Sequence, residues 1–311
     1  MAAIDCLVMH VKLPISIVIP TYQREQVLLD TLQYLLALPS RASEIIVVDQ
    51  TKRHADSTES SLTALVASGQ IHWIRVEWAS IPKAMNRGLC LATQPLVLFL
   101  DDDIRPDLQL VAAHVDAHRA NPDIIAAGRV LQPWHMGKDF TADDHFHFAS
   151  LNPRVIKEFM GGNFSIQKDS ALSLGGFDEN FVQVAYRFEA EFAHRFVLSG
   201  REIRFVPQAC IDHLKSAEGG TRAHGKLLTT MRPSHAVGNY YFLFRTKPWW
   251  KSLAMTLWLP FRAVATRHHL RNPWWILPSF IAEIRGVWWA FRLFIGGPSY
   301  IKRGVGTQTH G

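Results

Sequence analysis

The stretch Leu96-Val97-Leu98-Phe99-Leu100-Asp101-Asp102-Asp103 places five apolar residues directly before three consecutive carboxylates. A short apolar run of this kind predicts a buried strand, covered on both faces as in a parallel sheet. The acids then lie at its carboxyl end, the edge where open α/β sheets bind ligands. Carboxylates this close repel one another unless a cation lies among them. Oxygen ligands favour a hard divalent ion such as Mg²⁺ or Mn²⁺.

Other uses of an acidic triplet fit the surrounding residues less well. An isolated triplet would favour a solvated turn before a helix, here over residues 108–120. A calcium loop beginning at Asp101 requires glycine at its sixth position and glutamate at its twelfth, where this chain has Pro106 and Ala112. A phosphoacceptor aspartate follows an earlier strand, and a nucleotidyltransferase requires a glycine-rich phosphate loop after the first strand. This chain has Pro20-Thr21-Tyr22 there, so a metal or phosphate site after the fourth strand is favoured.

Strands and helices alternate along the first two thirds of the chain. Apolar runs predict strands at 15–20, 44–49, 71–76 and 96–100, and short strands at 203–206 and 209–211. Apolar residues at helical spacing predict helices over 26–38, 58–67, 81–91, 188–198 and about 226–245. This order predicts a mostly parallel, doubly wound α/β sheet with right-handed crossovers.

Composition limits the class of protein. The chain has 311 residues and is 48% apolar, enough for one large domain and an appendage. Cys6, Cys90 and Cys210 have no paired spacing, so they predict neither a disulfide nor a cysteine metal site and fit a reducing compartment. The first 13 residues lack a basic segment followed by a long apolar run, so we expect no secretory signal and a cytoplasmic location.

The chain from Pro248 onward has a different composition. Residues 245–303 contain ten Lys or Arg, a single acid, Glu283, and seven of the ten tryptophans. No stretch of about 20 apolar residues is free of charge, so we expect no transmembrane span. Tryptophan and basic residues on amphipathic helices are typical of segments that lie on a membrane surface. The alternatives are a helical cap on the core or a dimer interface.

Several short motifs, taken in order, make the chain similar to a known family. They are SIVIPTY (16–22), IIVVD (45–49), KAMNRG (83–88), LFLDDD (98–103), GGN (161–163), GFDE (176–179) and EAEF (189–192), followed by Arg195, Gly200 and His213. Their order and spacing resemble the family 2 inverting glycosyltransferases over roughly residues 14–215. The resemblance implies a nucleotide-sugar-binding α/β fold, Mg²⁺ or Mn²⁺, and transfer from a nucleoside-diphosphate sugar, UDP by default.

The resemblance assigns the donor site to residues after the predicted strands. It implies nucleoside contacts at Pro20, Thr21, Tyr22 and Arg24, with Asp49 accepting a hydrogen bond from the base. It implies nucleotide or diphosphate contacts at Lys83, Asn86 and Arg87, and ribose or base contacts at Asp101 and Asp102. It implies a metal held by Asp103, together with Asp101 and His213.

The resemblance also implies an acceptor side. Gly161, Gly162 and Asn163 would form the floor beneath the donor sugar and the acceptor. The family usually has Glu-Asp at the general base, whereas this chain has Phe188 and Glu189 at those positions. Glu189 is therefore the implied base, with Glu191 as the alternative. The loop 216–225 is glycine-rich, and we expect it to close as a lid that brings Arg222 to the diphosphate.

These inferences combine into one expected function. We expect a catalytic domain over residues 1–225 and a helical appendage over residues 226–311 that holds the protein on the inner face of the cell membrane. The processive members of the family carry a Gln-x-x-Arg-Trp motif and transmembrane spans, which we do not find, so we expect transfer of one hexose or deoxyhexose. The expected role is assembly of a polysaccharide or glycolipid on a lipid-linked acceptor. We expect an anionic membrane as a partner and no nucleic acid, and leave a homo-oligomer open. The alternative is a non-catalytic nucleotide-sugar-binding module or a membrane scaffold.

Overall fold

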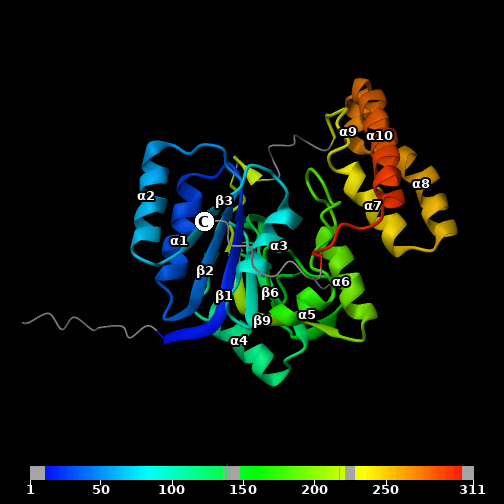
Figure 1. Cartoon of the computed structure of the whole chain (residues 1–311). Helices are drawn as coiled ribbons and strands as arrows, with labels where there is room; N and C mark the ends of the chain where they lie inside the picture. The colour runs from blue at the N-terminus through cyan, green and yellow to red at the C-terminus, as the bar shows by residue number, and fades with distance from the viewer. Residues whose placement is uncertain are drawn as a thin grey trace, which may run out of the picture.

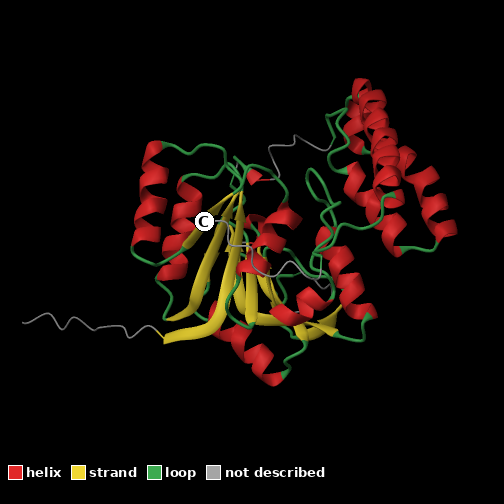
Figure 2. Cartoon of the chain, viewed as in Figure 1, coloured by secondary structure: helices red, strands yellow, loops and turns green. Residues whose placement is uncertain are grey.

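A nine-stranded sheet forms the centre of the computed structural model, which describes residues 11–135, 137–138, 140, 148–216, 218–220 and 228–302 (Figure 2). The strand order is β3-β2-β1-β4-β8-β6-β9-β5, and β7 pairs with β9 beside this path. The strands are β1 (Val11–Thr21), β2 (Ser40–Asp49), β3 (His72–Arg75), β4 (Leu96–Leu100), β5 (Ile104–Pro106), β6 (Ile124–Leu131), β7 (Arg154–Ile156), β8 (Asn163–Gln167) and β9 (Glu202–His213).

The first four strands of this order are parallel, and the rest of the sheet is mixed. β1 pairs in parallel with β2 and with β4, and β2 with β3. β8 lies antiparallel between β4 and β6, while β9 runs parallel to β6. The parallel part places the ends of β1 and β4 at one edge, so Pro20 and Thr21 lie beside the acids that follow β4. The predicted α/β class with a mostly parallel sheet is confirmed.

Helices cover both faces of the sheet (Figure 1). They are α1 (Gln26–Leu36), α2 (Asp56–Ala67), α3 (Ile81–Leu91), α4 (Leu110–Ala120), α5 (Lys168–Ser173) and α6 (Phe188–Leu198). Apolar side chains of α1, α2 and α4 pack on one face with Leu98 and Leu100, and those of α3, α5 and α6 pack on the other with Val97 and Phe99. The period of two along β4 explains why every residue of this strand is apolar.

The described C-terminal part is mainly helical, and its helices project away from the sheet (Figures 1 and 2). It contains α7 (Ala236–Thr246), α8 (Trp249–Val264), α9 (Arg267–Arg271) and α10 (Ile276–Ile295). We call α8, α9 and α10 the appendage. Helix α7 belongs to the core cluster, because its Tyr240 and Tyr241 are fully buried with residues of β4 and α6. The boundary predicted at 225/226 stays a prediction, but α7 packs as part of the core.

The segment that follows α10, residues 299–301, lies against the core. The backbone N–H of Ile301 donates to Gly175 O at 2.8 Å, and Glu179 N–H donates to Ser299 O at 2.9 Å. Tyr300 stacks with the Arg195 guanidinium 4.4 Å from its ring centroid. The appendage is therefore attached to the core at both of its ends.

The elements differ from the predicted ones in three respects. The two short strands predicted at 203–206 and 209–211 form one strand, β9, because its pairing with β6 resumes after an irregularity between Gly128 and Arg129. Strands β5 to β8 and helix α5 were not predicted. The helix predicted from about residue 226 begins at Ala236 in the described part of the chain. No helix among the described residues has the length and apolarity that crossing a bilayer requires.

Candidate functional site

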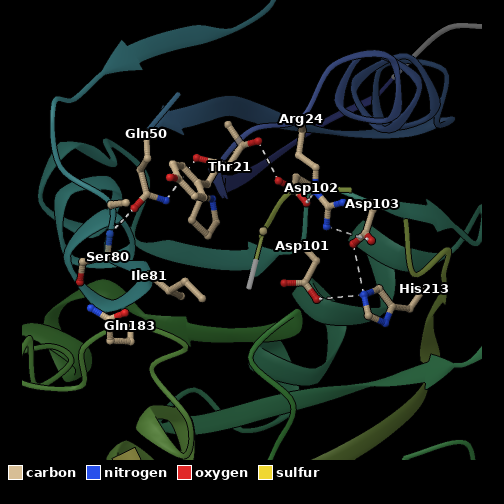
Figure 3. A pocket seen from close by; sticks show the side chains of 15 residues that line it. Thr21, Arg24, Gln50, Ser80, Ile81, Asp101, Asp102, Asp103, Gln183 and His213 are labelled. Atoms are coloured by element: carbon tan, nitrogen blue, oxygen red, sulfur yellow. Dashed lines mark hydrogen bonds and ion pairs between the residues drawn. The ribbon is translucent and has the colours of Figure 1, made fainter. Parts of the chain in front are cut away.

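A polar cavity of about 190 Å³ lies at the carboxyl ends of β1 and β4 (Figure 3). Its walls come from the segment after β1, the segment before α3, the acids after β4 and the end of β9. The lining residues are Pro20, Thr21, Tyr22, Arg24, Gln50, Ala79, Ser80, Ile81, Asp101, Asp102, Asp103, Gln183, His213, Gly219 and Gly220. The structure thus brings together the first four predicted donor residues, all three acids and His213.

The buried guanidinium of Arg24 organises the acidic edge of this cavity. Its Nε donates to Asp102 at 3.1 Å and its Nη2 donates to Asp103 at 3.2 Å, while its Nη1 donates to the carbonyl of Glu218. The Thr21 hydroxyl donates to the second oxygen of Asp102 at 2.7 Å. Both oxygens of Asp102 are therefore hydrogen-bonded within the protein, and Asp102 fixes Arg24. Asp103 uses one oxygen for Arg24, and its other oxygen faces His213.

Asp101, Asp103 and His213 form a cluster with the composition of a metal site. One atom of each lies within 4.8 Å of the others. His213 Nε2 is 3.2 Å from Asp103 and 3.7 Å from Asp101. His213 Nδ1 lies 3.1 Å from Gln132 Oε1. A proton on Nδ1 donates to that amide oxygen and leaves Nε2 as a ligand, which is how proteins orient metal-binding histidines.

The charges in this cluster fit a divalent cation. Burial raises the pKa of Asp101, and the charge of Asp103 adds to this effect. Burial also raises the pKa of Asp102, to about 7, against the opposing effect of Arg24. Burial acts in the same direction on Asp103, but His213, the charge of Arg24 and the Ser216 N–H together outweigh it and lower its pKa. Two carboxylates and one imidazole match the ligand preferences of Mn²⁺ and also admit Mg²⁺.

The opposite end of the cavity offers neutral hydrogen-bonding groups. Gln50 Nε2 donates to Thr21 O at 3.2 Å, and Gln50 Oε1 accepts from Ser80 N–H at 2.5 Å. The Ser80 hydroxyl is buried and has no hydrogen-bond partner among the described residues. Helix α3 begins at Ile81, so its first N–H groups and the positive end of its dipole face the cavity. These groups suit the base and phosphates of a nucleotide.

Asp49 lies beside this cavity but does not line it. Its Oδ2 is 2.7 Å from His54 Nε2 and accepts from Trp73 Nε1 at 2.9 Å, and its Oδ1 accepts from Thr51 N–H at 2.8 Å. The carboxylate is fully buried. Its hydrogen-bonding capacity is used within the protein, and Gln50, the next residue, faces the cavity instead.

The three predicted residues of α3 also lie outside the cavity. The Asn86 amide donates to Phe177 O at 2.9 Å and accepts from Phe177 N–H at 2.8 Å, which joins α3 to the segment before α6. Lys83 and Arg87 are exposed on the helix surface, where Lys83 lies 5.3 Å from the Trp78 ring centroid. The donor-facing part of α3 is its beginning, at Ser80 and Ile81.

Two consecutive glycines connect the acidic cluster to helix α6. A Cβ at Gly162 would lie 2.0 Å from Asp101 Oδ2, so a side chain there would displace the carboxylate. A Cβ at Gly161 would lie 3.2 Å from the Phe188 ring and 4.0 Å from Glu189 Cβ. The neighbouring Asn163 is fully buried, and its amide holds the backbone carbonyls of Arg129 and Ala209.

The two acids of α6 have different environments. Both oxygens of Glu191 accept from Arg195, at 2.8 and 2.9 Å, and Arg195 also holds the carbonyls of Leu174 and Gly176. Glu189 has no side-chain hydrogen bond or ion pair to another described residue. Burial raises the pKa of Glu189 to about 7, and the charge of Asp101 contributes. Glu189 is therefore a free carboxylate near the cluster, whereas Glu191 is a structural ion pair.

The predicted lid lies against the cavity in the part that the structure describes. Ser216 N–H donates to Asp103 at 2.9 Å, and Gly220 N–H donates to Tyr22 O at 2.8 Å. Gly219 has a φ of +72°, and a Cβ there would lie 2.2 Å from Gln23 O. Arg222 lies outside the described residues. Whether the loop opens and closes stays a prediction.

Four residues of the site had no clear signal in the sequence. Gln50, Ser80 and Gln183 line the cavity, and Gln132 orients His213. Gln50 and Ser80 follow a predicted strand and precede a predicted helix, so their positions could have marked them. Gln183 has a positive φ of 61° in an irregular segment, and Gln132 lies just after the unpredicted β6.

Comparison with known proteins agrees with this geometry. The model of Glycosyl transferase family 2 matches residues 16–181, slightly more than half of the chain. A curated relative, the glucosyl-dolichyl phosphate glucuronosyltransferase of Haloferax volcanii, is 26% identical over 178 residues, 53% of this chain and 56% of the relative. This chain therefore aligns with only about half the length of that protein.

Two solved glycosyltransferase structures share the fold. A mannosyltransferase from Pyrobaculum calidifontis, in complex with GDP-Man and Mn²⁺, has a TM-score of 0.54 at 17% identity and covers 91% of this chain and 79% of its own. GalNAc-T7 with UDP, GalNAc and Mn²⁺ has a TM-score of 0.54 at 15% identity and covers 66% of this chain and 44% of its own. With a family model over most of the α/β core and a polar cavity at the edge of its parallel strands, the chain belongs to glycosyl transferase family 2.

Proposed function

We propose that this glycosyltransferase is metal-dependent and inverting, and that it moves one hexose or deoxyhexose from a nucleoside-diphosphate sugar to a lipid-linked acceptor hydroxyl. The observation that carries the proposal is that Gly162 lies against Asp101 of the cluster with Asp103 and His213, while the adjacent Gly161 lies against Glu189. We propose that the donor sugar lies beside these glycines, between the leaving-group site and the proton acceptor.

In the proposed reaction, Glu189 accepts the proton of the acceptor hydroxyl while that oxygen bonds to the anomeric carbon of the donor sugar. The bond from this carbon to the diphosphate oxygen breaks, and its electron pair leaves with the nucleoside diphosphate from the opposite face. A divalent ion on Asp101, Asp103 and His213 would supply Lewis-acid stabilisation of the diphosphate. The beginning of α3 and its free Ser80 hydroxyl donate hydrogen bonds to the nucleotide.

The donor is proposed to be a UDP-sugar by default, with GDP- and dTDP-sugars as alternatives. Solved relatives contain UDP or GDP-Man together with Mn²⁺, which supports a nucleotide sugar and a divalent ion. In this chain the base would meet Gln50 rather than Asp49, because only Gln50 lines the cavity. The Gln50 amide already binds Thr21 O and Ser80 N–H, which leaves one N–H and one lone pair for the edge of a pyrimidine or a purine.

The acceptor is proposed to be attached to a lipid, in the assembly of a glycolipid or a cell-surface polysaccharide. The name of the Haloferax relative describes transfer to a glucosyl-dolichyl phosphate, which is a lipid-linked sugar. The outward face of α8 supports the same class of acceptor, because its apolar side chains are exposed: Trp249, Trp250, Leu253, Leu257, Trp258 and Phe261. Exposed apolar patches with a basic surround mark contacts with membranes or partners. We therefore place the protein on the cytoplasmic surface of a membrane.

Replacing the proposed base tests the reaction. Glu189→Gln keeps the side-chain shape but removes the proton acceptor, so transfer should fall by roughly 10²–10⁴-fold. Binding of UDP with Mn²⁺, measured by calorimetry, should remain. Glu191→Gln is the matched control: it breaks the pair with Arg195, so it should lower the melting temperature while the folded enzyme still turns over. Near-normal turnover of Glu189→Gln beside an inactive Glu191→Gln would transfer the role to Glu191.

A further inference from the structure

A second cavity, of about 380 Å³, lies between α7 and the three helices of the appendage. It is lined by residues of α7, α8, α10 and the segment before α7, and by Tyr186 of the core. It is larger than the donor cavity and shares no residue with it. The donor site described above therefore does not account for this second cavity.

One wall of the cavity is a closed network of polar side chains. The Thr266 hydroxyl donates to His269 Nδ1 at 2.8 Å, and His269 Nε2–H donates to Ser279 Oγ at 3.0 Å. Ser279 in turn donates to Leu228 O at 3.3 Å. Burial lowers the pKa of His269, so this histidine is neutral and structural. The network fixes α9 and α10 relative to each other and shapes the cavity.

Three further polar side chains of the cavity are unpaired within the described part of the chain. Three lining residues have side chains that make no hydrogen bond or ion pair with the described residues: Arg232, Arg262 and Asn239. The one carboxylate there, Glu283, accepts from the Tyr240 hydroxyl at 2.6 Å, and burial raises its pKa. The free groups are thus mainly cationic donors, which suit a phosphate.

The rest of the cavity is formed by apolar side chains together with Thr230 and His235, and it adjoins the exposed face of α8. Leu259 and Ala263 line it from α8, one turn apart, on either side of Arg262. The preceding residues Leu257 and Trp258 are exposed to solvent. A ligand with an apolar chain can therefore lie against α8 with its phosphate beside Arg262.

A short irregular segment connects this cavity to the donor site. Gln183 lines the donor cavity and Tyr186 lines the second cavity. Three residues of chain reach at most about 11 Å, so the two walls are close. Gln183, Ala185 and Arg187 all have positive φ, at 61°, 53° and 70°, which costs conformational energy and marks a constrained path. Helix α6, with Glu189, begins directly after this segment.

A close backbone contact holds the segment against α7. A Cβ at Gly238 would lie 2.4 Å from Tyr186 O, so only glycine allows α7 to approach this closely. The Arg187 guanidinium also lies 4.0 Å from the Phe242 ring centroid of α7. The core segment that leads to Glu189 is thereby a fixed wall of the second cavity.

We propose that this second cavity binds the acceptor, and that the acceptor is an amphipathic lipid phosphate. Its phosphate lies between Arg232 and Arg262, its apolar chain lies along α8, and the sugar that it carries extends past Tyr186 toward Glu189. This inference rests on the proposed function for the identity of the transfer reaction, but it concerns a separate cavity with its own residues.

Calorimetry on the full-length protein tests the proposal with a short lipid phosphate. Decyl phosphate is the probe, and decanol and inorganic phosphate are its two fragments. We expect decyl phosphate to bind at least about tenfold more tightly than either fragment, because only the intact probe uses both the arginines and the apolar wall. Arg232→Ala and Arg262→Ala should each weaken decyl phosphate about tenfold. Both residues are exposed, so these variants should fold.

Arg292→Ala is the matched control, because Arg292 is an exposed arginine of α10 outside the cavity. Equal weakening by Arg292→Ala, or decanol binding as tightly as decyl phosphate, would overturn the proposal in favour of general surface binding. Binding of UDP with Mn²⁺ is measured on the same samples. If UDP binds and decyl phosphate does not, the acceptor cavity is wrong and the donor site stands. If decyl phosphate binds and UDP does not, the proposed function fails while the lipid-phosphate site stands.

Discussion

The edge of the sheet and the appendage differ in which side chains they bury: the edge buries charged groups, and the appendage exposes apolar ones. At the edge, Asp102 and Arg24 are buried and held by two or more partners each. On the appendage, Trp249 and Trp258 are 80% and 64% exposed, and Arg262 has no partner among the described residues. The charged groups at the sheet edge are already desolvated and paired before any ligand binds. The appendage, in contrast, keeps apolar area in contact with water.

This difference indicates what each region is built to meet. A preorganised polar cavity recognises a small, charged ligand, because its groups need no rearrangement when the ligand arrives. An exposed aromatic surface gains free energy only when a larger apolar phase covers it. The two regions should therefore respond to different substitutions, and the three predictions below test that separation.

The largest effect is expected at the metal cluster. Asp103→Asn removes one of the proposed anionic ligands but keeps the side-chain shape, and Arg24 keeps its bond to Asp102. Metal stabilisation of a leaving diphosphate is worth several kcal/mol, so transfer should fall by about 10³-fold. Calorimetry should show loss of Mn²⁺-dependent UDP binding, while circular dichroism and vesicle binding stay unchanged.

Asp212→Asn is the control for this variant, because Asp212 lies next to His213 but forms an exposed pair with Arg105 at 3.0 Å. It should retain UDP binding and transfer. An Asp103→Asn protein that binds UDP with Mn²⁺ as well as the wild type would remove Asp103 from the metal site. Loss of vesicle binding in the same variant would break the separation of the two regions.

A smaller effect is expected on the appendage. Replacing both Trp249 and Trp258 by serine removes two exposed rings that would enter a membrane interface. At about 1–1.5 kcal/mol for each partly buried ring, affinity for anionic vesicles should fall by roughly 30–160-fold. Binding of UDP should not change. The remaining attraction through Lys and Arg should weaken with added salt, because salt screens exposed charges.

Leu198→Ser provides the control, since Leu198 is 72% exposed on α6 of the core. If membrane binding belongs to the appendage, this variant floats with vesicles as the wild type does. If Leu198→Ser and the tryptophan variant lose vesicle binding equally, then any exposed apolar residue contributes to membrane binding, whether it lies on the core or on the appendage. Wild-type protein that ignores anionic vesicles at low salt would leave the appendage as a helical cap.

The parts of the fold and site that could be predicted are those with a local signal. The apolar run of β4 and the acids after it are adjacent in sequence, so the strand and its ligand-binding end were read together. His213 follows an apolar strand and was identified in the same way. By contrast, β6 contains Ala126, Ala127 and Gly128, whose small side chains give neither strand nor helix periodicity. β8 directly follows Gly161 and Gly162, and glycines favour a turn over a strand, so its five residues carry a weak strand signal.

Residues whose role depends on direction could not be assigned from sequence. Asp49 and Gln50 are neighbours at the end of β2, and successive side chains of a strand point to opposite sides. The family resemblance implies that Asp49 contacts the base, whereas Gln50 is the residue that lines the cavity. The resemblance also implies that Asn86 lies near the nucleotide, whereas its amide ties α3 to Phe177. Only the packed structure determines these directions.

The smallest predicted effect is the pH dependence of the transfer rate. It compares two parts of the core: Glu189 has no ion pair with another described residue, whereas the acids around Arg24 are paired. Burial raises the pKa of Glu189 to about 7. A general base acts only when it is ionised, so the transfer rate should decrease as pH falls through 7. The ionised fraction drops from about 0.9 at pH 8 to about 0.1 at pH 6, and kcat/KM should fall about tenfold over this range.

Separating this titration from that of the metal cluster requires UDP affinity at each pH. Any titration within the metal cluster appears in Mn²⁺-dependent binding, whereas that of Glu189 appears in kcat at saturating donor. The residual transfer by Glu189→Gln should then be independent of pH between 6 and 8, because the variant has no carboxylate to ionise. If the variant keeps the tenfold fall, another group is the base. If the wild-type rate is flat across this range, the pKa of Glu189 lies well below 7 and its burial is relieved when the donor binds.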